Sequence, residues 1–241
     1  MTAIEIKNLT KRFDQRIAVD SLNLSIEQGE MFALLGQNGA GKTTTIKMLC
    51  CLLSPTSGDA VLLGDSIVKN PTEVKQKINV SPQETAVAPK LSVRENLELI
   101  ARIYGCNKGE AKQKANEMLE SFGLTERARD KAKSLSGGMQ RRLSIAMALI
   151  SNPEIIFLDE PTLGLDVRAR RDLWSLIREM KGKITIVLTT HYLEEAEALC
   201  DRIAIMHGGK IMVLGTASQI KEETGKETLE DAFLLLTEEA V

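Results

Sequence analysis

Residues 31–44 read MFALLGQNGAGKTT. The first five are continuously apolar, which predicts a buried strand. From Gly36 onward the spacing is G-x-x-x-x-G-K-T, and a helix is expected from about 42 to 53. Glycines let the backbone wrap around an anion, so that the N–H groups of residues 39–43 point at phosphate beside a helix N-terminus. The alternative is a chance glycine turn with a surface lysine, but the matching strand and helix favour a phosphate-binding loop.

Two side chains of this loop carry the predicted chemistry. Lys42 would reach the β- and γ-phosphates of a nucleotide, and the Thr43 hydroxyl would ligate Mg²⁺. The loop residues that we expect to contact the nucleotide are Gly36, Asn38, Gly39, Ala40, Gly41, Lys42, Thr43 and Thr44.

A second apolar strand, residues 155–158, ends in two carboxylates, Asp159 and Glu160. In a phosphate-loop protein the first acid holds Mg²⁺ and its water shell. Glu160 follows at the carboxyl end of the strand, where open α/β sheets place ligands, so it is the candidate base for the attacking water. The alternative is an ordinary acidic pair before Pro161 at the start of a helix, and the presence of the phosphate loop argues against it.

Strands and helices alternate on both sides of these motifs. Apolar patterns predict strands around 4–6, 22–26, 60–63, 78–81, 155–158, 184–189 and 203–206. Between about 85 and 152 the pattern is almost entirely helical, and further helices are expected at about 168–180 and 193–199. A final amphipathic segment, 229–236, is expected to pack back on the core. The pattern predicts a parallel α/β core interrupted by a helical insertion.

Composition and charge argue against several classes of protein. Of the 241 residues, 43% are hydrophobic and 27% are charged, which excludes a disordered or collagen-like chain. The 31 basic and 33 acidic residues give a net charge of −2, which argues against nucleic-acid binding. No apolar run approaches the roughly 18 residues of a spanning helix, and the N-terminus lacks a signal-peptide core, so we expect a soluble chain. The 4 cysteines form no CxxC pair, which fits a reducing cytosol and argues against a zinc site.

Residues 135–140 read LSGGMQ and open a helix. The Ser-Gly-Gly start exposes backbone N–H groups to an anion, although the same residues would serve a simply capped helix. Taken together and in this order, the three motifs resemble those of the ATP-binding subunits of ABC transporters, whose signature sequence is LSGGQ or LSGGM. The resemblance covers about residues 2–220. Its departures are Gln37, where proline is frequent, and Met139 in the signature, and neither removes a phosphate ligand.

The resemblance implies roles for four further positions. Gln83 matches the glutamine that senses Mg²⁺ and the γ-phosphate and faces the membrane partner, and Asp166 matches a residue of the subunit interface. His191 matches the switch histidine that contacts the γ-phosphate, although a lone histidine at a strand end is often structural. Phe13 lies where the family places an aromatic that stacks on adenine, and its alternative is a core aromatic of the N-terminal strands.

The resemblance also implies a site shared between two chains. In the family, one phosphate loop and one signature act on the same ATP from opposite subunits. Ser136, Gly137 and Gly138 are therefore expected to contact the ATP of a paired ATPase subunit in a head-to-tail dimer. The predicted catalytic residues are Lys42, Gln83, Glu160 and His191, and the predicted Mg²⁺ site is Thr43, Gln83 and Asp159.

The expected fold class is α/β. It comprises a phosphate-loop NTPase core with a RecA-like parallel sheet, an N-terminal antiparallel β-subdomain and an inserted α-helical subdomain at about 85–152. An ATPase domain is expected over 1–220 and a helical tail over 221–241. The tail sequence LEDAFLLLT at 229–237 looks like that of the drug-export and ABC-2 subfamily, although a docking helix without subfamily meaning would look the same. The resemblance thus implies an ATPase at the cytoplasmic face of a membrane that powers a separate permease, with export as the favoured direction.

Two other functions fit parts of the sequence. A soluble ABC-type ATPase acting on DNA or ribosomes would carry a long coiled-coil insertion or a second ATPase unit, and neither is found in 241 residues with a net charge near zero. A nucleotide-binding regulator that does not hydrolyse ATP would have no need of a base such as Glu160 beside Asp159.

Overall fold

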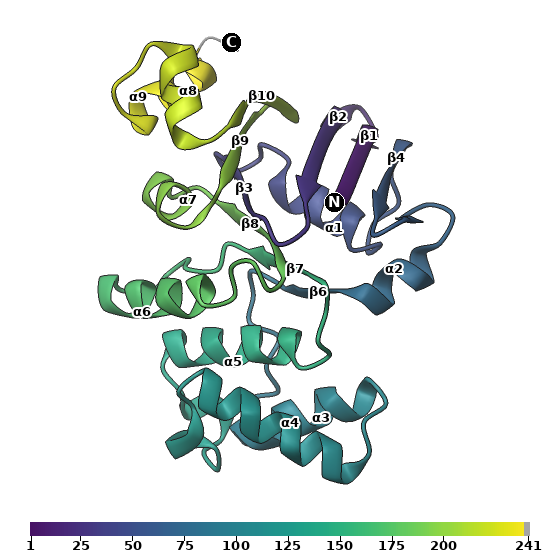
Figure 1. Ribbon diagram of the computed structural model, residues 1–241, viewed down its shortest axis with the longest axis vertical. Coiled ribbons are helices and arrows are strands. Elements are labelled where there is room, and N and C mark those ends of the chain that lie inside the picture. Colours follow the sequence, from purple (N-terminus) through teal and green to yellow (C-terminus); the bar gives the residue numbers. More distant parts are fainter. Residues whose placement is uncertain (239–241) are drawn as a thin grey trace.

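The computed structural model describes residues 1–238, which form two β-sheets and a helical region (Figure 1). The larger sheet has the strand order β10-β9-β3-β8-β7-β6. Its strands are β3 (Met31–Gly36), β6 (Ile78–Ser81), β7 (Ile155–Asp159), β8 (Thr185–Thr190), β9 (Arg202–His207) and β10 (Lys210–Gly215). Neighbouring strands pair in parallel except β9 and β10, so the predicted parallel α/β core is confirmed.

The smaller sheet is antiparallel and contains the N-terminus. Its order is β2-β1-β4-β5, with β1 (Thr2–Phe13), β2 (Arg16–Glu27), β4 (Ser57–Leu62) and β5 (Asp65–Ser66). Alternate side chains of β3 divide the core into two parts, because successive residues of a strand point to opposite faces. Phe32 and Leu34 pack with the smaller sheet and with helix α1 (Lys42–Leu49), whereas Met31 and Leu35 pack with the helices that follow residue 92.

The helical region contains α3 (Val93–Ile103), α4 (Lys108–Ser121) and α5 (Gly137–Leu149). It begins later than the expected residue 85, because Ser92 and Glu95 form a capping box that starts α3 at Val93. The Asn96 side chain holds the preceding loop by bonding to both the N–H and the C=O of Ala88. The helical region lies at the opposite end of the molecule from the C-terminal helices (Figure 1).

The other helices are α2 (Pro71–Lys77), α6 (Val167–Arg178), α7 (Leu193–Leu199), α8 (Ala217–Thr224) and α9 (Leu229–Glu238). Helix α9 buries Leu229 and Ala232 in the core cluster shared with β9 and α8, as expected for an amphipathic tail. The predicted domain boundary at residue 220 falls inside α8 and stays a prediction. Residues 239–241 of the predicted tail lie outside the described part of the chain.

Two local predictions differ from the structure. Helix α1 ends at Leu49 and not at about 53, because Cys51 has a left-handed φ of 53° and turns the chain out of the helix. Strand β10 was absent from the expected elements. A hairpin through Gly208 and Gly209, with φ of 54° and 82°, pairs it with β9.

Within residues 1–238, no helix is both long enough and apolar enough to span a membrane.

Candidate active site

The predicted site residues gather where three neighbouring strands of the parallel sheet end. Strand β3 leads into the glycine-rich loop, β7 ends at Asp159, and β8 ends at Thr190. The register pairs Leu35 with Thr190 and Asp159 with Thr189, so these carboxyl ends lie at one edge. This is where open α/β sheets place their ligands.

Glycines shape the loop at two positions. Gly41 has a φ of 106°, and a Cβ there would lie 2.5 Å from the carbonyl oxygen of Ala18. A Cβ on Gly36 would lie 2.5 Å from the carbonyl oxygen of Met206. Any larger residue at either position would push the loop away from its neighbouring strand, so the loop conformation depends on these two glycines.

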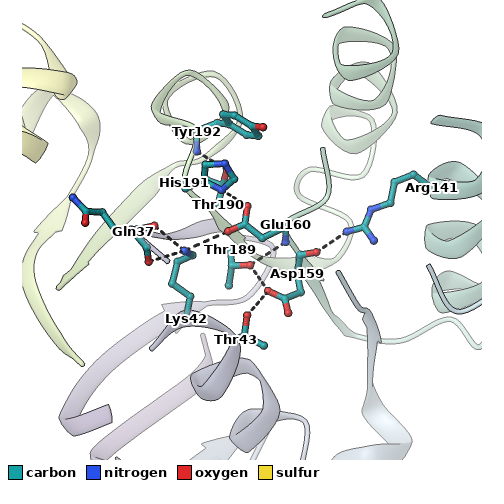
Figure 2. A network of polar contacts seen from close by, with 11 residues as sticks. Gln37, Lys42, Thr43, Arg141, Asp159, Glu160, Thr189, Thr190, His191 and Tyr192 are labelled. Atoms are coloured by element: carbon teal, nitrogen blue, oxygen red, sulfur yellow. Dashed lines mark hydrogen bonds and ion pairs between the residues drawn. The ribbon is translucent and has the colours of Figure 1, made fainter. Parts of the chain in front are cut away.

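Lys42 is 5% exposed and points back over its own loop (Figure 2). Its Nζ donates to the carbonyl oxygens of Gly36 at 2.7 Å and Gln37 at 3.3 Å. It also forms an ion pair with Glu160, with 3.3 Å between Nζ and Oε1. The buried charge is therefore fixed at the centre of the loop by two carbonyl groups and one carboxylate.

Asp159 joins the helix after the loop to the neighbouring strand. Its Oδ1 accepts from the Thr43 hydroxyl at 3.1 Å and from the Thr189 hydroxyl at 2.5 Å. The Thr43 hydroxyl and the Asp159 carboxylate both offer oxygen ligands, which Mg²⁺ prefers. No group of three or more His, Cys, Asp or Glu side chains could hold a metal within the described residues. A magnesium ion at this pair would therefore also need oxygens from a bound phosphate or from water.

Glu160 is 6% exposed and has a left-handed φ of 48°, which is unusual for a residue other than glycine. Thr189 holds this backbone, because its carbonyl oxygen and its hydroxyl both accept from the Glu160 N–H, at 3.2 and 3.0 Å. The side chain reaches His191, with 2.8 Å between Oε2 and Nδ1. Strained backbone of this kind clusters at functional sites, where the surroundings fix a side chain in one direction.

A cavity of about 500 Å³ lies over these groups. It is lined by residues 37–44 of the loop and by Phe13, Gln83, Glu160 and His191, together with Arg16, Ala18 and Leu163. Phe13 is 45% exposed and lines this cavity, which disfavours the alternative that it is a core aromatic. Gly36 and Asp159 lie outside the lining, but they bond to two lining residues, Lys42 and Thr43. The volume is within the usual range for a small-molecule site.

The signature residues lie elsewhere. Ser136 and Gly137 are exposed at the start of α5, where the Ser136 hydroxyl accepts from the Met139 N–H at 3.3 Å. Asp166 is also exposed and caps α6 by accepting from the Ala169 N–H at 2.9 Å. None of these residues, nor Gly138, lines the cavity. The structure thus brings together the predicted residues of the loop, the two carboxylates, Gln83, His191 and Phe13, but not those of the signature.

Three polar or charged residues at the site were not predicted from the sequence. Arg16 lines the cavity because the β1–β2 hairpin pairs it with Phe13. Thr189 bonds to both carboxylate residues, and Arg141 donates to the carbonyl oxygen of Asp159 at 2.6 Å. A basic residue three positions after Phe13 and a threonine near the end of an apolar strand were possible signals for Arg16 and Thr189, whereas nothing local marks Arg141.

Comparison with known proteins adds to this geometry. The sequence profile described as "ABC transporter" matches residues 19–163. The chain belongs to the ABC transporter family. It is an ATP-binding and ATP-hydrolysing subunit of such a transporter, as the motifs predict.

Two relatives and one solved structure illustrate the match. The chain is 40% identical to the linearmycin resistance ATP-binding protein LnrL of Bacillus subtilis, over 94% of this chain and 73% of that protein. It is 41% identical to the daunorubicin/doxorubicin resistance ATP-binding protein DrrA of Streptomyces peucetius, over 94% of this chain and 69% of that one. A dimeric post-hydrolysis structure of the ATP-binding cassette MJ0796 with ADP and Pi matches with a TM-score of 0.80 and 28% identity, over 88% of this chain and 98% of that one. These matches favour transport over the alternative of an ATPase acting on DNA or ribosomes.

Proposed function

We propose that this ATPase drives the export of drug-like compounds through a separate membrane permease, which holds it at the cytoplasmic face of the membrane. The support for export comes from the two relatives, whose names refer to resistance against linearmycin and against daunorubicin and doxorubicin. The support for hydrolysis at this site is the convergence of Lys42, Glu160 and His191 on one cavity.

The loop and Lys42 would bind the phosphates of ATP. Lys42 is buried and already faces the cavity, where its partners are two carbonyl oxygens and the Glu160 carboxylate. Phosphate oxygens carry more negative charge than carbonyl oxygens and compete for the same ammonium group. Binding of ATP would therefore draw Lys42 from Glu160 and leave this carboxylate available to water. Phe13 would stack on the adenine at the rim of the cavity.

Thr43 and Asp159 would hold Mg²⁺, and Gln83, which lines the same cavity, would contribute a third ligand. When bound with the nucleotide, the ion would neutralise part of the charge on the phosphate oxygens. Thr189 keeps the Asp159 carboxylate turned towards Thr43 through its 2.5 Å hydrogen bond. The two oxygen donors are thus held together before any ligand arrives, which reduces the cost of ordering them.

Glu160 would orient the attacking water and accept its proton. Its left-handed backbone and its contact with His191 aim the carboxylate into the cavity. His191 lies 2.8 Å from the carboxylate and lines the same cavity, so it would connect the base with the γ-phosphate. Because Thr189 fixes the backbone of Glu160 and His191 fixes its carboxylate, this base loses little freedom when the water binds.

The exposed signature would act on the ATP of a second ATPase subunit. Ser136 and Gly137 at the start of α5 are exposed and do not line the chain's own cavity, so within one chain they do not complete it. A head-to-tail pair would place Ser136, Gly137 and Gly138 of each chain over the loop of the other, with Asp166 at the interface. The similarity to a dimeric ATP-binding cassette supports this arrangement.

Transport by the chain and its co-purifying membrane protein tests the proposal. Both would be reconstituted in vesicles with the ATPase outside, and ATP-dependent accumulation of daunorubicin and of other drugs would be measured. We expect accumulation with the native chain and none with Glu160→Gln, which should keep the fold and the membrane partner because the two side chains have the same size. ATP hydrolysis without accumulation of any drug, or purification with DNA or ribosomes in place of a membrane protein, would contradict the proposed export function.

A further inference from the structure

Arg141 is a buried basic residue that the mechanism above does not use. It lies on α5, close after the exposed Ser136, and its side chain is 4% exposed. It points from α5 towards the end of β7 (Figure 2). A guanidinium group in such a position needs partners for its N–H groups, because burial without hydrogen bonds is costly.

The partners of Arg141 come from two separate segments of the site, residues 82–83 and residues 159–161. Nε donates to the carbonyl oxygen of Pro161 at 2.8 Å, and NH2 donates to that of Asp159 at 2.6 Å. NH1 donates to the carbonyl oxygen of Pro82 and, at 3.4 Å, to that of Gln83. One planar group thus joins the signature helix to the loop that carries Gln83 and to the backbone on both sides of Glu160.

All of these acceptors are backbone carbonyl groups. Side-chain acceptors could rotate away, whereas carbonyl groups move only with the chain itself, so the contacts fix backbone position. Burial lowers the pKa of Arg141 to about 10, although the charges of Asp159, Glu195 and Glu160 oppose this shift. Arg141 therefore stays charged at neutral pH, and its bonds to the carbonyl groups are charge-assisted.

Only arginine suits this position. Its planar fork carries five N–H donors in fixed directions, which allows its three nitrogens to reach both segments at once. A lysine would keep the charge but offers a single nitrogen on a flexible stem. The neighbouring Arg142 provides a contrast, because its NH2 forms an ordinary ion pair at 3.1 Å with the exposed carboxylate of Asp172 on α6.

We propose that Arg141 is a positioning residue that locks the signature helix to the chain's own Gln83 loop and to the end of β7. In the proposed head-to-tail dimer, on which this inference rests, α5 would contact the ATP of the partner subunit. Glu160 and Gln83 would contact the chain's own ATP. Arg141 would therefore keep the two ATP sites in a fixed relation, so that closure of one site aligns the other.

Kinetics of Arg141→Lys and Arg141→Gln, with Arg142→Gln as the matched control, give the first test. Misplacement of a reacting group by about 1 Å can cost about 10²-fold, so we expect kcat to fall about 10- to 100-fold while the KM for ATP changes less than about threefold. Lysine should not restore kcat, since charge alone does not make the three contacts. The control should retain the native kcat. Native kcat in Arg141→Gln would overturn the proposal.

Dimer formation separates positioning from a merely structural role. The Glu160→Gln chain would be used with Mg²⁺ and ATP, with and without Arg141→Gln, and measured for nucleotide affinity, melting temperature and dimer dissociation constant. We expect unchanged nucleotide affinity, with about tenfold weaker dimerisation, equivalent to about 1.4 kcal/mol. Equal dimerisation in both chains, or a loss of nucleotide binding in step with the melting temperature, would overturn the role of Arg141. Failure of Glu160→Gln itself to dimerise would instead contradict the proposed dimer.

Discussion

The loop at residues 36–44 and the start of α5 at residues 135–140 are both glycine-rich and both precede a helix, yet the structure places them in opposite situations. In the first, Lys42 is buried against Glu160, and the Thr43 hydroxyl bonds to Asp159 at the end of β7. In the second, Ser136 and Gly137 are exposed, and none of residues 135–140 lines the cavity. One chain therefore assembles a phosphate site from its own loop, whereas its signature lies outside that site, as the proposed action on a second subunit requires.

The largest effect should follow from removing Lys42. Lys42→Ala loses the charged hydrogen bonds to phosphate, each worth about 1.5–3 kcal/mol, so the Kd for ATP should rise about 10- to 150-fold and hydrolysis should disappear. Equilibrium binding of ATP and phosphate release would be measured. Lys47→Ala, on the exposed side of the same helix, is the control. Near-native turnover in Lys42→Ala would remove the assignment of the phosphate loop.

The next largest effect separates ATP binding from ATP hydrolysis at the phosphate loop. Glu160→Gln keeps the size of the side chain but removes the base, so kcat should fall about 10²- to 10⁴-fold while ATP still binds. Glu154→Gln, at the other end of the same strand, should behave like the native chain. With Mg²⁺ and ATP the Glu160→Gln chain should accumulate as a dimer in size-exclusion chromatography. A monomer that nevertheless binds ATP would count against the sandwich of two ATP molecules.

A smaller effect concerns the rim of the cavity. Stacking of a base on an aromatic ring is worth about 1–3 kcal/mol, so Phe13→Ala should raise the Kd for ATP about 5- to 150-fold with little change in kcat. Phe13→Tyr keeps the ring and should bind ATP normally. Unchanged ATP affinity in Phe13→Ala would show that the adenine lies elsewhere. It would not contradict the assignment of the phosphate contacts.

Local sequence predicted the regions whose function depends on consecutive residues. The strand of residues 31–36, the glycine turn and the helix after it follow from apolar runs and glycine spacing, and Asp159 and Glu160 follow from their place after an apolar strand. The positions of Gln83, His191 and Phe13 in one cavity came from the family resemblance, and the structure brings these side chains to the same place.

The rest depends on contacts between distant segments. Arg141 could not be singled out, because its partners lie in the loop at 82–83 and at the end of β7, far from it in the sequence. Arg16 reaches the cavity only through strand pairing in the β1–β2 hairpin. The early end of α1 is set by the left-handed backbone of Cys51, a residue that carries no turn signal of its own. Propensity and periodicity describe local preference, and tertiary contacts override it at these positions.

Activity of a mixed pair of variants tests most directly whether two chains share each site. One chain carries Lys42→Ala and the other Ser136→Arg, and each is inactive alone because both sites of its homodimer are damaged. In a head-to-tail heterodimer one site collects both defects, and the other combines an intact Lys42 with an intact Ser136. We predict that mixing restores ATPase activity that neither variant shows alone. If the mixed chains form heterodimers, as differently tagged subunits would reveal, and ATPase activity still does not return, the shared-site account is contradicted.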